Sequence, residues 1–97
     1  MMKLYKNKKG EKLYPVCKWE DNQHKLYNAN DRIWNAIHDA EENKASADEL
    51  DKLYDRKDEI ERVMCIFDSQ VIDGIVYATY KDSLIIKDII WTYNARH

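Results

Sequence analysis

Hydrophobic residues recur every three or four positions along much of this chain, a spacing that places them on one side of a helix. The pattern is clearest after Ser46. Ser46 and Glu49 have the spacing of a capping box, in which the serine hydroxyl accepts the backbone N–H three residues further on. The apolar positions that follow with helical spacing are Leu50, Leu53, Ile60, Met64, Phe67 and Val71. We therefore predict one long helix over residues 46–80.

Residues 69–93 also allow a second interpretation. The dipeptide Asp73-Gly74, set between Ile72 and Ile75, is typical of a tight β-hairpin turn. In the helical interpretation, Gly74 instead permits the close approach of another backbone. We favour the unbroken helix, and a β-meander over 69–93 remains the alternative.

The C-terminal segment presents the same choice. Residues 84–86 and 89–93 are rich in types that favour strands, yet polar residues recur at helical spacing beside them. We therefore predict a short helix over residues 83–95, started by Asp82 or Ser83. Its buried side would hold the isoleucines and Tyr93.

An earlier helix is predicted over residues 22–42, started by Asp21 or Asn22. Its apolar line consists of Leu26, Ala29, Ile33, Ile37 and Ala40. The connection to the next helix is short, which favours an antiparallel pair. Residues 1–20 read as a β-hairpin or basic arm, in which Gly10 closes the turn and Pro15 restricts its strand to an edge.

The predicted fold is thus mainly α, a single domain of 97 residues built on an antiparallel helical hairpin. Two glycines and one proline leave little room for the many tight turns of a β-sandwich or barrel. No apolar run is long enough to cross a membrane, and no N-terminal secretion signal is present. We expect a soluble protein of the cytoplasm.

The predicted length of the 46–80 helix leads to an expectation about assembly. Such a helix would be about 50 Å long, whereas a compact chain of this size has a radius of gyration near 13 Å. An apolar stripe that extends beyond its own globule needs a second chain, so we predict a homo-oligomer. Its interface would be formed by Leu53, Ile60, Met64, Phe67 and Val71.

No catalytic motif, cofactor motif or metal-ligand spacing occurs in the sequence. His38 with Glu41 and Glu42 is the best group for a metal, but one histidine beside two surface acids is a weak signal. Cys17 and Cys65 belong to no motif and read as free, buried thiols. We therefore predict no catalytic residues, no metal and no cofactor, and a protein that is not an enzyme.

A second line of side chains on the 22–42 helix is the predicted partner-binding site: Tyr27, Asp31, Trp34 and His38. Tyrosine and tryptophan dominate protein-binding hot spots because they supply rigid contact area. The alternative is that Tyr27 and Trp34 are ordinary core aromatics that cover the N-terminal hairpin.

Charge is distributed unevenly, although the net charge is only −2. Residues 1–18 carry six lysines and one glutamate, and residues 39–61 carry ten acids and four bases. The phosphate-contacting candidates in a nucleic-acid reading are Lys6, Lys8, Lys9 and Lys12. A pocket between two chains, with Arg32 or Arg96, could instead hold a nucleotide-like anion.

Among these functions we favour protein–protein interaction. The chain reads as a small non-enzymatic binding protein that occupies a surface of a larger protein. Its many Lys, Asn, Ile and Tyr residues suit a bacteriophage or mobile element, so an inhibitor of a host factor is the expected role. Nucleic-acid binding and sequestration of an anionic ligand are the alternatives.

Overall fold

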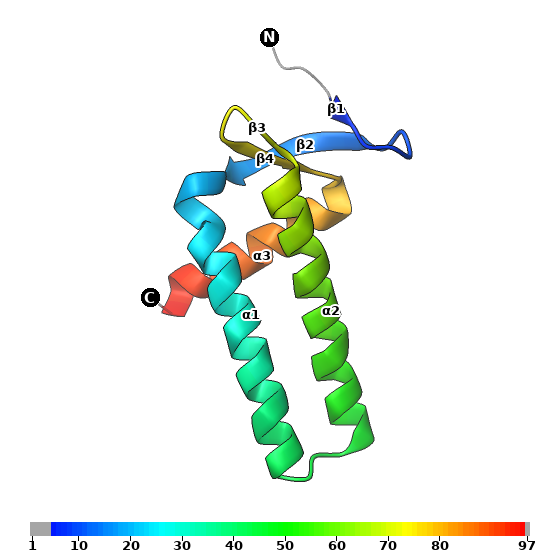
Figure 1. Ribbon diagram of the computed structural model, residues 1–97, viewed down its shortest axis with the longest axis vertical. Coiled ribbons are helices and arrows are strands. Elements are labelled where there is room, and N and C mark those ends of the chain that lie inside the picture. Colours follow the sequence, from blue (N-terminus) through cyan, green and yellow to red (C-terminus); the bar gives the residue numbers. More distant parts are fainter. Residues whose placement is uncertain (1–4, 97) are drawn as a thin grey trace.

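The structure is a computed structural model that describes residues 5–96 (Figure 1). In chain order its elements are β1 (Tyr5–Lys6), β2 (Lys12–Lys18), α1 (Trp19–Glu42), α2 (Ala47–Ser69), β3 (Val71–Ile72), β4 (Ile75–Ala78) and α3 (Tyr80–Arg96). The predicted mainly α fold, with a helical pair, a shorter C-terminal helix and an N-terminal strand arm, is confirmed. The first four residues of that arm lie outside the described residues.

The helices α1 and α2 form an antiparallel pair because a short connection joins Glu42 to Ala47 (Figure 1). Ser46 starts α2 as predicted, since the Glu49 N–H donates a hydrogen bond to Ser46 Oγ at 3.3 Å. The pair makes the molecule elongated, with extents of 53 × 31 × 18 Å.

The start of α1 lies three residues before the predicted position and uses a different acceptor. The Trp19 N–H donates to the carbonyl oxygen of Gly74 at 2.9 Å. Asn22 is not the cap, because it is buried in the first turn, where its Nδ2 donates to the Lys18 carbonyl at 2.8 Å. Asp21 is likewise inside the helix, so both predicted caps are wrong.

The prediction of one helix over residues 46–80 is also wrong beyond Ser69. Asp73 and Gly74 have φ angles of 54° and 79°, so both lie in the left-handed region that a right-handed helix excludes. They form the turn between β3 and β4, which is the hairpin alternative. The helix is therefore shorter than predicted, and its length no longer calls for a second chain.

The four strands form one antiparallel sheet in the order β1-β2-β4-β3. Hence β2 lies between β1 and β4. Because β1 pairs only with Lys12 and Leu13, Pro15 has, among the described residues, a ladder partner on one side alone, Tyr77, which agrees with its predicted edge position. The register shifts between Pro15 and Cys17, a bulge that accommodates a residue without an N–H. The N-terminal hairpin is confirmed, with Gly10 at a φ of 81°.

The helix α3 begins at Tyr80, earlier than the predicted residue 83, and Thr79 is its cap. The Asp82 N–H donates to Thr79 Oγ1 at 3.3 Å, and the Ser83 N–H donates to the Thr79 carbonyl at 2.8 Å. Asp82 and Ser83, the predicted caps, are instead buried in the first turn. Asp82 there accepts a hydrogen bond from Arg62 Nη1 at 2.5 Å.

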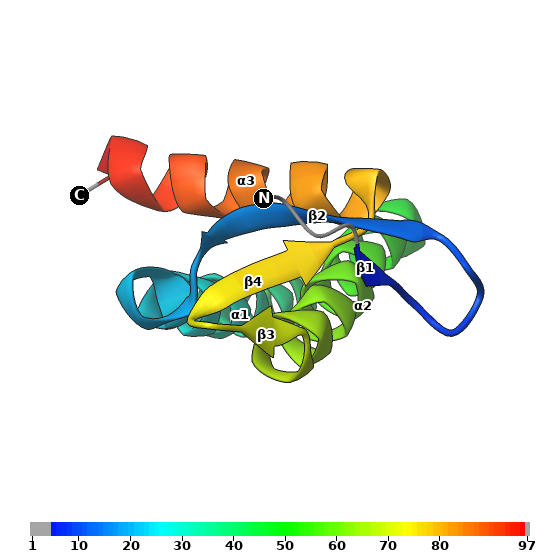
Figure 2. The same cartoon turned by 90° about the horizontal axis from the view of Figure 1, so that it is seen from above.

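The sheet covers one end of the α1–α2 pair, and α3 runs beside β2 along one flank of the sheet (Figure 2). The core lies where these layers meet and consists of Leu26, Ile33, Ile37, Ile60, Val63, Phe67, Val76, Ala78, Ile86 and Ile89. Ile60 and Phe67 are only 3% and 1% exposed, and Leu53, Met64 and Val71 pack partly buried against this core. Ile60 and Phe67 of the predicted oligomer interface thus lie in the interior of a single chain, and the other three residues are partly covered by it.

Candidate functional site

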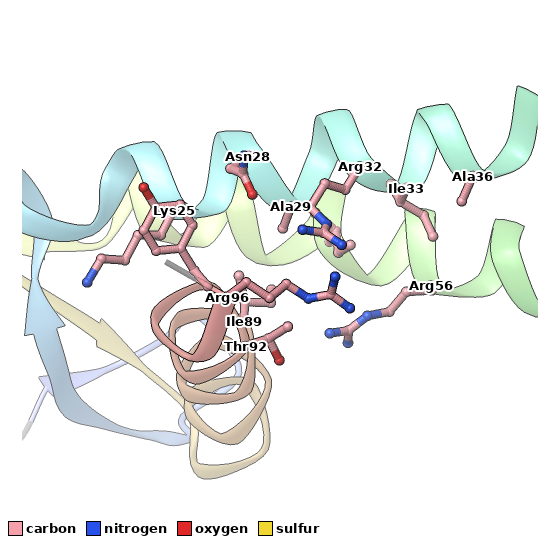
Figure 3. Close-up of a pocket in the computed structure, with 12 residues that line it drawn as sticks. Lys25, Asn28, Ala29, Arg32, Ile33, Ala36, Arg56, Ile89, Thr92 and Arg96 are labelled. Carbon is pink, nitrogen blue, oxygen red and sulfur yellow. The ribbon is translucent and has the colours of Figure 1, made fainter.

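A cleft of about 250 Å³ opens between α1, α2 and α3 (Figure 3). The side chains of its floor are mainly apolar, and its rim carries four cationic side chains. The lining residues are Lys25, Asn28, Ala29, Arg32, Ile33, Ala36, Arg56, Ile60, Ile89, Thr92, Tyr93 and Arg96. No carboxylate is among them.

Each of the three helices contributes one arginine to the cleft: Arg32 from α1, Arg56 from α2 and Arg96 from α3. Their guanidinium groups gather at one end, whereas the Lys25 ammonium lies at the other end (Figure 3). Converging like charges repel one another, which raises the free energy of the free protein. A bound anion would remove this repulsion.

The three arginines differ in their partners. Arg56 forms ion pairs with Glu59 in its own helix and with Asp88 of α3, the latter between Nη2 and Oδ2 at 3.0 Å. Arg56 therefore joins α2 to α3. Within residues 5–96, no carboxylate forms an ion pair with Arg32 or Arg96.

The sequence of α1 explains why a cleft forms at this place. Lys25, Ala29, Arg32 and Ala36 recur at steps of four, three and four residues, so they share one side of the helix. The two alanines leave space beside α3, and the long basic side chains border that space. This alternation of small and basic residues is the signal that sequence reasoning missed.

An aromatic cluster forms the Lys25 end of the cleft. The Lys25 ammonium lies 5.8 Å from the centroid of the Tyr93 ring, and the His24 ring meets Tyr93 edge-on at 5.3 Å. The Tyr93 ring is thus held against the floor as an apolar contact surface.

The predicted partner stripe lies on the other side of the α1–α2 pair. Trp34 is two residues from Arg32 and Ala36, which face α3, so it points away from α3 at about 100° per residue. The Trp34 ring lies under the Lys57 ammonium at 5.0 Å and beside the His38 ring at 6.3 Å.

The four side chains of this stripe are all exposed, with Tyr27 at 48% and Trp34 at 37%. They are therefore surface side chains, and binding by them stays a prediction. Nearby, Tyr54 donates from its hydroxyl to Glu41 Oε1 at 3.3 Å, and the Glu41 carboxylate raises the pKa of Tyr54.

The lysine-rich arm borders a broad, open basin on the β1–β2 hairpin side. Lys6, Lys8 and Lys9 line it together with Arg62 and Lys81. Lys12 is not among its lining residues, although it lies opposite Lys6 in the ladder. Glu11 and Asp82 also line the basin, so its cations are partly balanced.

The two cysteines are free, as predicted, but only one is shielded. Cys17 is half-buried, and burial raises the pKa of its thiol to about 11, an effect that Lys25 and Lys87 partly oppose. Cys65 is exposed, which corrects the prediction that it is buried. In the described part of the chain, no three histidine, cysteine or acidic side chains lie close enough to hold a metal.

No protein-family model matches the chain, and no curated protein or solved structure matches it at a significant level. Within the described residues, every helix is too short or too polar to cross a membrane. Function is therefore inferred from the geometry of the chain's own surfaces.

Proposed function

We propose that this chain is a non-enzymatic binding protein that holds an acidic segment of a partner protein in the cleft between α1, α2 and α3. The observation that supports this function is the convergence of Arg32, Arg56 and Arg96 at one end of an apolar floor. One carboxylate of the segment lies among the guanidinium groups. An apolar side chain next to it fills the cavity.

Arginine suits this role because its planar fork binds a carboxylate through two parallel hydrogen bonds. Arg56, already held by Glu59 and Asp88, supports the site, while Arg32 and Arg96 remain available to the ligand. The apolar floor adds affinity by removing a hydrophobic side chain from water.

The spacing of the cations favours a peptide over a single small anion. Lys25 and Arg32 are seven residues apart on α1, which is about 10 Å along the helix. A lone phosphate or carboxylate cannot contact both ends of the cleft. An extended segment with two or more acidic residues can do so, while most of its length stays outside a cavity of about 250 Å³.

This function has the form expected from the sequence, a small protein that occupies a surface of a larger one. Blocking an acidic surface in this way would inhibit the partner, and a phage origin stays a prediction from composition. The two free thiols, Cys17 and Cys65, suit a reducing compartment, so we place the binding event in the cytoplasm.

The test uses a fluorescently labelled peptide of eight alternating glutamate and leucine residues, titrated with the protein and followed by anisotropy. Two control peptides replace the glutamates by glutamine or the leucines by serine. We expect the parent peptide to bind and both controls to bind at least about tenfold more weakly, a difference of about 1.4 kcal/mol.

Arg32→Gln combined with Arg96→Gln should weaken binding of the parent peptide about tenfold, since two exposed charge pairs together contribute roughly 1–2 kcal/mol. Lys52→Gln, which removes an exposed positive charge of α2 outside the cleft, is the matched control and should change affinity less than twofold. Equal binding by the double variant would contradict the assignment.

The same assay separates the two other functions. If adenosine triphosphate displaces the peptide, and if replacing the leucines does not change the affinity, the ligand of the cleft is a nucleotide-like anion and not a peptide. A single-stranded oligonucleotide that binds more tightly than the peptide, and loses affinity when Lys6, Lys8 and Lys9 are changed to glutamine, would move the function to the basin.

A further inference from the structure

The outer side of α3 carries three large apolar side chains that the core does not use. Tyr80, Leu84 and Trp91 are 68%, 49% and 70% exposed, and Tyr80 and Trp91 exceed the other exposed large hydrophobic residues of the described chain. They are four and seven residues apart, so they lie along one line of the helix. Figure 2 shows that α3 forms the outer flank of the molecule.

This line is distinct from the buried side of α3 and from the cleft. Ile86 and Ile89 face the core at 0% and 3% exposure. Trp91 is two residues from Ile89, which places it on a different side of the helix at about 100° per residue. Removing these exposed apolar side chains from water would be favourable.

The line is complementary to the same line on a second copy when the two α3 helices run antiparallel. With a two-fold axis between residues 87 and 88, Leu84 lies opposite the partner's Trp91. The same axis places Lys87 opposite the partner's Asp88. An isologous dimer interface needs a patch with this kind of self-complementarity.

We infer that two copies of this chain associate through an antiparallel pairing of their α3 helices. The apolar pairs Leu84 with Trp91 occur twice, on either side of the axis, and opposite charges meet at its centre. Asp88 also bonds to Arg56, but its side chain is still 60% exposed and accessible to a lysine of the second copy. The surface differs from the one predicted from the sequence, of which Ile60 and Phe67 lie in the core.

The extent of the surface sets the expected strength of the dimer. From Tyr80 to Trp91 the line is about 16 Å long, whereas stable interfaces bury about 800 Å² on each partner. This shortage predicts a weak, concentration-dependent dimer. The two clefts would stay open, because their α3 residues face away from this line.

Sedimentation equilibrium between 1 and 500 µM tests the dimer. The wild-type chain should dimerise across this range, and Trp91→Ser should raise the dissociation constant at least about tenfold. Tyr27→Ser, which removes an exposed aromatic ring from α1, is the matched control and should leave dimerisation unchanged. A wild-type monomer at 500 µM overturns the inference, and so does a dimer that is lost with Tyr27→Ser but not with Trp91→Ser.

A charge exchange tests the antiparallel register. Lys87→Glu and Asp88→Lys each place like charges opposite one another and should weaken the dimer about threefold or more. Because Asp88→Lys also sets a cation beside Arg56, all variants of this series and their reference chain carry Arg56→Gln. The double variant restores opposite charges only if the two residues meet across the axis, so we expect near wild-type dimerisation. A double variant as weak as the weaker single variant overturns the register, and circular dichroism of each variant verifies its folding.

Discussion

Gly74→Ala distinguishes the hairpin from the long helix by the sign of its effect on stability. In the structure, Gly74 has a φ of 79° and follows Asp73 at 54° in the β3–β4 turn. An added Cβ would meet no atom within 4 Å, so crowding contributes nothing. The effect of the substitution is therefore almost purely conformational.

The magnitude follows from the left-handed backbone. A residue with a Cβ costs about 1–2 kcal/mol in this region relative to glycine. Gly74→Ala should therefore lower the free energy of unfolding by about 1–2 kcal/mol. In a continuous helix the same change would raise it by about 1 kcal/mol, because alanine has the higher helix propensity.

Urea denaturation followed by circular dichroism measures the difference. For a slope of about 1–2 kcal/mol per molar urea, we expect the midpoint to fall by roughly 1 M. Gly10→Ala is the matched control, since Gly10 has a φ of 81° and also no atom within 4 Å of an added Cβ. It should also destabilise, but less, because β1 has only two residues. A midpoint that rises with Gly74→Ala would refute the turn.

Two further predictions concern the Asp82 carboxylate and the Cys17 thiol. Arg62→Ala leaves Asp82, which is 8% exposed, without the guanidinium that donates to it at 2.5 Å. The substitution should lower the free energy of unfolding, measured in urea, by about 2 kcal/mol, whereas Arg32→Ala should lower it by at most about 0.5 kcal/mol. Equal losses for the two variants would contradict the role of the Arg62–Asp82 pair. Burial raises the pKa of the Cys17 thiol from 9.0 to about 11. The raised pKa lowers the thiolate population about a hundredfold, while the nucleophilicity of the thiolate rises less. Iodoacetamide at pH 8 should therefore modify native Cys17 at least about tenfold more slowly than Cys17 of the chain unfolded in urea, as measured by mass spectrometry of the modified peptides. Equal rates would refute the shielding of Cys17. The unfolded chain ionises first, so this group also makes stability fall as the pH rises from about 9 towards 11.

The sequence predicted the parts of the fold that depend on local patterns. Ser46 and Glu49 marked the start of α2, and the short connection after residue 42 correctly made the two helices antiparallel. Gly10 correctly marked the first hairpin. In each case the decisive interaction joins residues close in sequence.

The corner after Ser69 could not be predicted in this way, because its stabilising partner is distant in the chain. β4 pairs with β2, so Tyr77 lies opposite Pro15 across about sixty residues. An isolated β1–β2 ribbon would be marginal, whereas a four-stranded sheet packed on helices is stable. The β3–β4 turn also supplies the Gly74 carbonyl that accepts from the first N–H of α1.

The cleft combines a local signal with a non-local one, which explains why sequence reasoning recovered only part of it. Arg32 and Arg96 were recognised as cations for an anion, but between two chains. The structure brings them to one cleft in one chain, because α3 packs along the side of α1 that carries Ala29 and Ala36. That docking depends on the position of the sheet, which the unbroken helix would have removed.

The three arginines of the cleft differ in their ion-pair partners. Arg56 has two carboxylate partners, one on each of the two helices that it joins. Packing alone gives no reason for Arg32 and Arg96 to converge on the same end, where they add repulsion and, within residues 5–96, have no acidic partner. An anionic ligand would supply the missing counter-charge. The stability of the free chain and its affinity for an acidic peptide should therefore respond to different arginines.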